Sequence, residues 1–316
     1  MAHTFLDLSH SFDSNAVRDL GELPEPDWQQ FLTAWRNRQY ATAWIPAVAR
    51  EVAGRNLLFA LIASPARDIR PIVTAVRRFD DLSRGLMMPP WESQFRYSVF
   101  EYAGDPRAVQ QLVDDVAARK LLDAVTTIQS ASDIAVTRTS DSSFVLALNT
   151  GAVVSKHAFD FSFTDHATQA LPIFARMVQL PENATPQEIR QSVWEIVPHL
   201  VVGYARDFNV PEDVLTRLAE KWDASDQHPD AFFTYSVFLE CWFKIQFAKG
   251  MLTRRIRESD GQDLRIASYL SHSRTLVTSD NRLRVMLENI TRDPASRMMT
   301  FAQLMDSMDI RQGGPR

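Results

Sequence analysis

Acidic side chains at the ends of apolar segments are the residues of this chain best suited to do chemistry. Asp7 interrupts the apolar stretch TFLDLS, Glu51 lies in the helix predicted for PAVAREVAG, and Asp280 ends the apolar run SRTLVTSD. Asp260 and Asp263 lie close together where another helix is expected to begin. The carboxyl ends of parallel strands and the helix N-termini that follow them share one edge of a sheet, so these acids are expected to converge.

Carboxylates that converge need a counter-charge, because they cannot all ionise side by side without one. The chain has one cysteine, Cys241, and its seven histidines are not at ligand spacing. Oxygen ligands of this kind suit a hard cation such as Mg²⁺ or Mn²⁺. A pair of such ions would activate a water and stabilise the leaving oxygen of a phosphodiester.

Each acid also has a purely structural interpretation. Asp260 and Asp263 could be stabilised by backbone N–H groups at a helix N-terminus, and Asp280 could cap the helix that follows it. Glu51 could be a solvated helix residue. Asp7 is the hardest to explain in this way, because an unpaired aspartate in an apolar strand is costly to bury.

Composition and missing motifs exclude several classes of protein. The 316 residues are 45% hydrophobic with a formal net charge of −5, which predicts one or two globular units rather than a disordered chain or a general nucleic-acid coat. No apolar run approaches the length of a membrane span, and the N-terminus lacks a secretory signal, which predicts a cytoplasmic protein without a membrane partner. GxGxxG, GxxxxGK[ST], HExxH and GxSxG are absent.

The apolar pattern predicts helices and strands in alternation near both ends of the chain. A buried strand is expected over residues 4–9, followed by a loop over 10–15, and a helix is expected from Pro46. Between them, an amphipathic helix is expected from an apolar stripe at helical spacing, formed by Trp28, Phe31, Leu32 and Trp35. Near the other end, SRTLVTSD is expected to be a buried strand and 281–289 a helix. Short loops between helix and strand are typical of an α/β layer.

The region between these ends is predicted to be mostly helical. One helix is expected to run from Asp105 to about Val125, and another from Pro186 to Pro198 or just beyond. Short strands are expected over 144–148 and 151–155. A long buried helix is expected over 230–249, after a polar boundary.

Several of these segments resemble those of PIN-domain nucleases. DLRIASYLSHSRTLVTSDNRLR resembles the family's C-terminal motif, with Asp263 at the start of a helix and Asp280 at the end of a strand. TFLDLS resembles the first strand with its aspartate, Asp7, and WIPAVAREVAG resembles the segment that carries the family's glutamate, Glu51. Asp260 resembles a further acid in relatives that read NDxxDL, although Ser259 replaces the asparagine here.

The resemblance implies an α/β, PIN-like domain with a central parallel sheet flanked by helices. Residues 1–56 and 230–316 would form it, and a mostly helical insertion over 57–229 would interrupt it. Far more residues separate Glu51 from Asp263 than is usual in the family.

The resemblance also implies the activity, an endoribonuclease that depends on Mg²⁺ or Mn²⁺ and hydrolyses RNA. Asp7, Asp263 and Asp280 would hold the metal, Glu51 would complete its shell or orient the water, and Asp260 would assist. A toxin-type ribonuclease, with a protein inhibitor or self-association through the insertion, is a further expectation. The alternative is a catalytically inactive PIN-like scaffold whose insertion binds a protein partner or regulates the domain.

Arginines near the C-terminal acids suit a phosphate substrate. Arg254, Arg255, Arg257 and Arg282 are expected to contact a nucleic-acid backbone, although the chain as a whole is acidic. A solvated basic face is the structural alternative for these residues.

Overall fold

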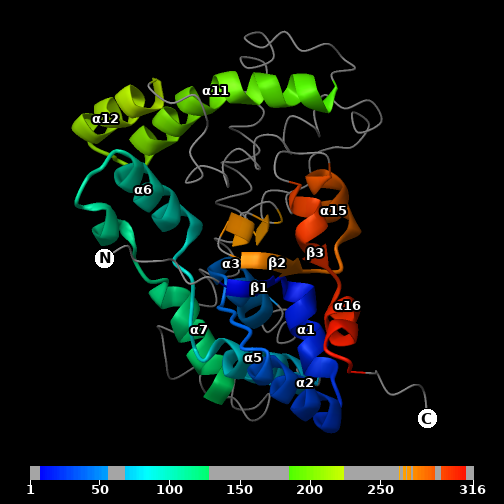
Figure 1. The fold of residues 1–316 in the computed structure, drawn as a ribbon. Coiled ribbons are helices and arrows are strands. Elements are labelled where there is room, and N and C mark those ends of the chain that lie inside the picture. Colours follow the sequence, from blue (N-terminus) through cyan, green and yellow to red (C-terminus); the bar gives the residue numbers. More distant parts are fainter. Residues whose placement is uncertain are drawn as a thin grey trace.

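A small parallel sheet joins the two ends of a mostly helical chain (Figure 1). The computed structural model describes residues 8–55, 68–127, 185–223, 263, 266–267, 269–271, 273–288 and 293–310. The strands β1 (Leu8–Phe12), β2 (Ser273–Val277) and β3 (Met298–Met299) lie in that order, and both pairings are parallel. The prediction of a parallel sheet built from both ends of the chain is confirmed.

The first strand lies later in the sequence than predicted. The loop expected over 10–15 is wrong for its first three residues, which belong to β1, and Asp7 lies outside the described residues. His10 is the reason: its polar ring suggested a loop, yet it is buried between Trp35 and Tyr40, with ring centroids 5.3 and 4.6 Å away. The carboxyl end of β1 is therefore at Phe12, and Asp13 follows it directly.

Two helices close one side of the sheet through an unusually tight contact. Asp13 caps α1 (Ser14–Glu22) by accepting a hydrogen bond from the Ala16 N–H, and α1 packs along α5 (Arg70–Ser83). A Cβ atom on Gly21 would lie 2.5 Å from a carbonyl oxygen of α5, so the helices approach as closely as they do because this residue is glycine.

The chain returns to the sheet through a helix that changes type partway. α2 (Glu25–Asn37) carries the apolar stripe expected from its sequence, and α3 (Pro46–Ala49) begins at proline as predicted. The helix then continues as the π-helix η1 (Arg50–Arg55). Glu51 therefore lies in a π turn rather than in a regular α-helix.

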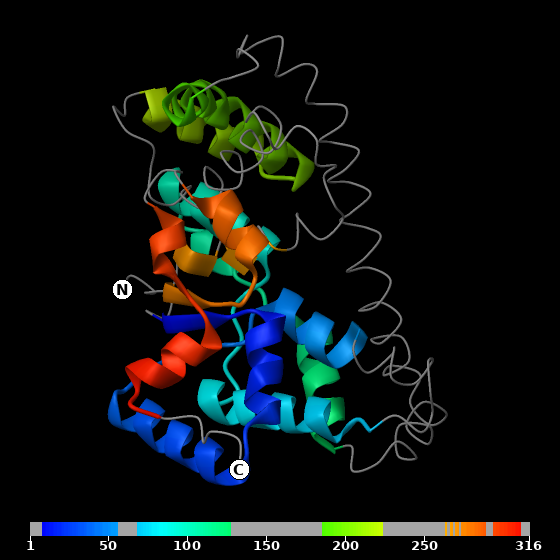
Figure 2. The ribbon, with the colours of Figure 1, turned by 90° about the vertical axis from the view of Figure 1, so that its right-hand side faces the viewer.

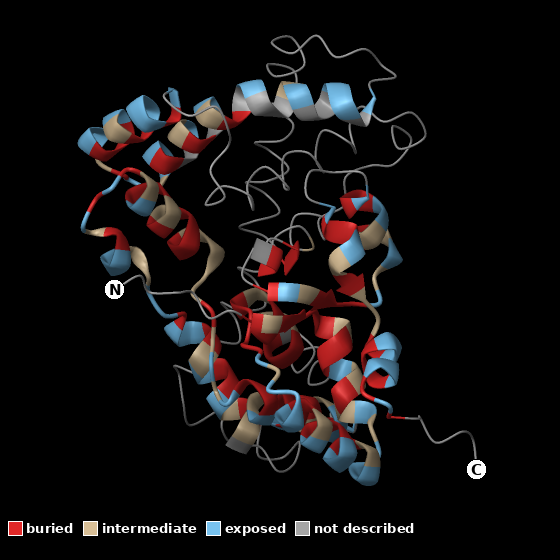
Figure 3. Ribbon diagram, in the orientation of Figure 1, coloured by how far each residue is buried: buried red, intermediate tan, exposed pale blue. Residues whose placement is uncertain are grey.

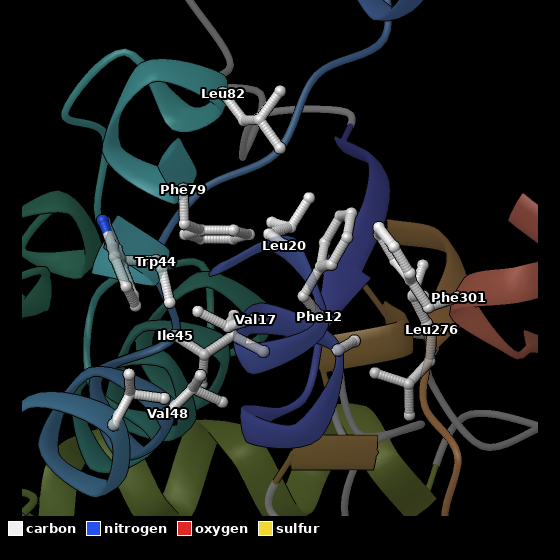
Figure 4. Close-up of a cluster of buried hydrophobic side chains, with 14 of the residues drawn as sticks. Phe12, Val17, Leu20, Trp44, Ile45, Val48, Phe79, Leu82, Leu276 and Phe301 are labelled. Atoms are coloured by element: carbon white, nitrogen blue, oxygen red, sulfur yellow. The ribbon is translucent and has the colours of Figure 1, made fainter. Parts of the chain in front are cut away.

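The core lies between the sheet and these helices (Figure 4). Phe79 of α5 packs edge-on against Phe12 and Trp44, with ring centroids 5.2 and 4.4 Å away, and Leu276 of β2 belongs to the same cluster. α7 (Val116–Thr127) adds Leu121 and other buried side chains to it. Buried positions accordingly concentrate around the sheet in Figure 3.

The boundary predicted at residue 56 does not separate two cores. Both α5 and α7 fall inside the segment predicted as an insertion, yet they contribute to the same cluster as β1, α1 and α16 (Phe301–Ser307). The division into a PIN-like domain and an insertion stays a prediction. This part of the central segment supports the sheet directly.

The helix predicted from Asp105 to Val125 is interrupted. Residues 108–111 form a short 3-10 helix, η2 (Ala108–Gln111), and α7 starts only at Val116. The interruption follows from two aspartates: the Asp105 carboxylate bonds the Arg107 backbone N–H, and Asp115 starts a new helix by accepting the N–H of Ala118.

A second group of helices lies at the far end of the molecule from α2 and α5 (Figures 1 and 2). It contains α6 (Trp91–Tyr102), α11 (Pro186–Asp207) and α12 (Glu212–Asp223), and α11 continues well past Pro198. The buried carboxylate of Asp105 pairs with Arg107 and Arg217 at 2.7 and 2.5 Å, which links α12 to the end of α6.

The C-terminal elements complete the sheet. α15 (Asn281–Leu287) follows β2 as predicted, and the 3-10 helix η6 (Pro294–Arg297) leads into β3 and α16. The strands predicted over 144–148 and 151–155 and the helix over 230–249 lie outside the described residues. None of the described helices combines the length and apolar character needed to cross a lipid bilayer.

Candidate functional site

The carboxyl ends of β1 and β2 bring two aspartates to one edge of the sheet. Asp13 follows β1, and its N–H bonds the carbonyl oxygen of Val277, the last residue of β2. Asp280 lies three residues beyond that strand end. The parallel pairing of Phe12 with Val277 thus places both acids at the carboxyl edge of the sheet, where the sequence predicts Asp280 but not Asp13.

Thr278 connects the two aspartates. Its hydroxyl donates to Oδ2 of Asp13 and accepts the backbone N–H of Asp280 at 3.0 Å. Its own N–H bonds the Met299 carbonyl at 2.8 Å, which fixes it to β3. The threonine therefore holds one carboxylate against the backbone of the other.

Asp13 is the most perturbed carboxyl at this edge. The residue is 5% exposed, and burial is the main cause that raises its pKa from 3.8 to about 6. The Ala16 N–H and the Thr278 hydroxyl lower the pKa, whereas the negative charge of Glu51 raises it further. Asp13 is thus a buried carboxyl near a second acid, Glu51. A cation bound at such a place would offset the charge of both groups.

Glu51 reaches this edge from the π turn. The residue is half-buried, and η1 packs against α1, the helix that Asp13 caps. Its negative charge contributes to the raised pKa of Asp13. Of the predicted site residues, Glu51 and Asp280 are thus brought to the vicinity of Asp13.

Asp280 has the structural role that its sequence also allowed. Its Oδ1 accepts the backbone N–H groups of Arg282 and Leu283 at 2.7 and 3.1 Å, which caps α15. The capping interpretation of Asp280 is confirmed. A capping oxygen is held in a fixed position.

Asp263 lies beside a cation from α15. Its Oδ2 is 3.8 Å from Nη2 of Arg282, and the two side chains are 21% and 37% exposed. Arg282 therefore faces an acid of the candidate site, and its predicted contact with a nucleic-acid backbone stays a prediction. Asp7, Asp260, Arg254, Arg255 and Arg257 lie outside the described residues.

The described acids do not form a closed metal cage. Within the part of the chain that the structure describes, no three His, Cys, Asp or Glu side chains are grouped closely enough to hold a metal ion. The donor set nevertheless suits one class of ion, because Asp13, Glu51 and Asp280 offer carboxylate oxygens and neither sulfur nor imidazole. Such ligands favour Mg²⁺ or Mn²⁺ over zinc or copper.

The sequence interpretation missed Asp13. The signal was present: Leu8, His10 and Phe12 alternate toward one face, and DSNAVRDL then combines a capping aspartate with Val17 and Leu20 at helical spacing. The strand predicted over 4–9 placed its aspartate at Asp7 instead.

Comparisons with known proteins add no relative from which a role for this site could be inferred. The chain matches no protein-family model, and neither a curated protein nor a solved structure was found to match it.

Proposed function

We propose that the carboxyl edge of the sheet is the active site of a divalent-metal-dependent endoribonuclease of PIN-like architecture. The observation that carries the proposal is Asp13, a buried carboxyl with a raised pKa, which Thr278 holds against the strand end that leads to Asp280. Capping α1 accounts for one oxygen of Asp13, but burying its carboxylate near the negative charge of Glu51 is unfavourable without a counter-charge. Such an arrangement is typical of sites that bind a cation.

The residues of the edge have distinct roles in this proposal. Asp13, Glu51 and Asp280 would hold Mg²⁺ or Mn²⁺ once the ion draws their carboxylates closer together than the described side chains lie, and Asp263, beside Arg282 of α15, would assist. Bound there, the ion would activate a water and stabilise the leaving oxygen of an RNA phosphodiester. Thr278 orients Asp13, and Arg282 offsets the charge of Asp263 so that a phosphate can approach.

Calorimetric titration with Mn²⁺ tests the metal site directly. The wild-type protein is expected to bind Mn²⁺, and Asp13→Asn and Asp280→Asn are each expected to lose binding. Asparagine retains the Oδ1 oxygen that caps α1 or α15, so both variants are expected to fold. Asp68→Asn, at an exposed ion pair with Arg70, is the matched control and is expected to bind normally.

Cleavage of a structured RNA by the same proteins tests the activity. Mn²⁺-dependent cleavage is expected from the wild-type protein and from Asp68→Asn, and from neither site variant. Cleavage that survives both Asp13→Asn and Asp280→Asn would assign the activity elsewhere. Asp7→Asn belongs in the same series, since the resemblance assigns the first aspartate to Asp7 and the strand end assigns it to Asp13.

One observation favours the alternative of a scaffold that binds a protein. Val109, Val113 and Val116 are 47%, 55% and 59% exposed in the stretch that interrupts the predicted helix between α6 and α7. Contiguous exposed apolar patches are typical of interaction surfaces, and these three valines lie within eight residues of one another. Wild-type protein that neither binds Mn²⁺ nor cleaves RNA would favour this function over the nuclease.

A further inference from the structure

The helix that carries Glu51 changes from α to π one residue before it. α3 ends at Ala49, and η1 begins at Arg50. A π turn contains one residue more than an α turn, and such turns are frequent at functional sites. They redirect side chains, so the direction of Glu51 depends on what keeps this turn in place.

An ion pair from outside the sheet holds the turn. Arg50 Nη2 lies 2.5 Å from Oδ2 of Asp115, and the side chains are 31% and 4% exposed. Oδ1 of Asp115 accepts the Ala118 N–H at 3.0 Å and so caps α7. The contact at Oδ2 is an ion pair without regular hydrogen-bond geometry, so the attraction between the charges is what joins the two side chains.

Asp115, the partner of Arg50, lies at the start of a helix that is firmly packed in the core. α7 is anchored in the core by Ala118, Leu121, Leu122 and Val125, all of them at most 1% exposed. It packs against both α3 and η1. Removing one member of a buried ion pair leaves an uncompensated charge, which is strongly unfavourable. Arg50 is therefore held toward α7.

Holding Arg50 determines where the next residue lies. η1 packs against both α7 and α1. Arg50 faces α7, and the adjacent Glu51 acts electrostatically on Asp13 at the start of α1. The π turn thus separates two neighbouring side chains toward two different helices.

We propose that the ion pair between Arg50 and Asp115 fixes the π turn so that Glu51 faces the carboxyl edge of the sheet. Asp115 is then a positioning residue of the candidate site, contributed by the segment predicted as an insertion. The consequence for metal binding rests on the proposed function, whereas the consequence for the turn does not.

The test compares two aspartates with the same local chemistry. Asp105, like Asp115, is buried, accepts a backbone N–H and pairs with arginine, but it pairs with both Arg107 and Arg217 and lies among the helices of the far end. Asp115→Asn and Asp105→Asn each keep the capping oxygen and remove the charge. Each full-length protein is titrated with Mn²⁺ by calorimetry, and amide hydrogen exchange over 50–55 is followed without metal.

Asp115→Asn is expected to weaken Mn²⁺ binding by about 10-fold or more, in the range seen when a ligand loses its supporting contact. Exchange over 50–55 is expected to accelerate in this variant, whereas Asp105→Asn leaves both measurements at the wild-type value. Arg50→Gln and the double variant with Asp115→Asn are expected to match Asp115→Asn alone, because the pair acts as one unit.

The outcomes separate this inference from the proposed function. Wild-type Mn²⁺ affinity in Asp115→Asn would overturn the inference and leave the metal site standing. A wild-type protein that binds no Mn²⁺, with faster exchange over 50–55 in Asp115→Asn alone, would overturn the nuclease and support the ion pair as the fixing contact. Equal effects in Asp115→Asn and Asp105→Asn would show general destabilisation and overturn the inference.

Discussion

Replacing Asp13 by asparagine is expected to stabilise the fold while it removes the candidate metal site. Burial raises the pKa of Asp13 from 3.8 to about 6, so the folded protein carries an unfavourable carboxylate at pH 7.5. One pKa unit corresponds to about 1.4 kcal/mol, which puts the cost of this charge near 3 kcal/mol above pH 6. The cost vanishes below pH 3.8, where both folded and unfolded states are protonated, and it grows as the pH rises to 6.

Urea unfolding in the presence of a chelator measures this cost. Asparagine keeps the oxygen that accepts the Ala16 N–H but weakens the contact with Thr278. A net gain of about 1–3 kcal/mol is therefore expected at pH 7.5, and it should fall by about 2 kcal/mol at pH 4.5, because the cost of the charge drops from about 3 to about 1 kcal/mol. The buried His10 is common to both proteins and cancels in the difference. An equal gain at both pH values, or a loss at pH 7.5, would refute the assignment of a strained charge to Asp13.

Three further predictions concern the fold, each measured by urea unfolding. Gly21→Ala is expected to destabilise the fold by about 1–3 kcal/mol, because its Cβ would clash with α5. Gly203→Ala, which has open space around it on α11, is expected to stabilise the fold by about 0.5–1 kcal/mol. Equal effects of the two substitutions would contradict the tight contact between α1 and α5. Burial lowers the pKa of His10 from 6.5 to about 4, so the unfolded state binds a proton at a higher pH than the folded state does. The free energy of unfolding is therefore expected to fall by about 3 kcal/mol as the pH drops from above 6.5 to 4, and His10→Gln should make it less dependent on pH in this range. Arg78→Ala is expected to cost about 3 kcal/mol, since the buried guanidinium bonds two carbonyl oxygens at the end of α1; a loss below 1 kcal/mol would show that water replaces it.

The sequence predicts best where apolar spacing and capping agree. The stripe of α2, the proline that starts α3, and the strand and helix on either side of Asp280 are all confirmed by the structure. In each case local preference and burial favour the same element. The parallel sheet between the chain ends follows from the same agreement.

The sequence predicts less well where tertiary contacts override local pattern. His10 reads as a loop residue, but aromatic rings from α2 and the following loop bury it in β1. The apolar positions between Asp105 and Val125 fit one helix, yet Asp115 caps a separate helix through one carboxylate oxygen while Arg50 pairs with the other. Neither contact is visible in a local window, since each partner lies more than 20 residues away in the sequence.

The same limitation explains which acid the sequence interpretation selected. A strand that ends at Ser9 leaves Asp7 as its aspartate, whereas a strand that ends at Phe12 leaves Asp13 at the edge of the sheet. The register of β1 on β2, with Phe12 opposite Val277, places Asp13 at this edge, whereas Asp7 lies outside the described residues and its assignment stays a prediction.

The charges around this edge are unevenly compensated, and that asymmetry favours a cation at one place. Asp263 has Arg282 at 3.8 Å, and Asp280 has two backbone N–H groups. Asp13 accepts hydrogen bonds from a backbone N–H and a neutral hydroxyl, which lower its pKa, whereas burial and the charge of Glu51 raise it. The two hydrogen bonds are too weak to prevent the net rise of the pKa. A divalent ion bound between Asp13 and Glu51 would reverse that balance, so Mn²⁺ should stabilise the wild-type fold and leave Asp13→Asn unchanged.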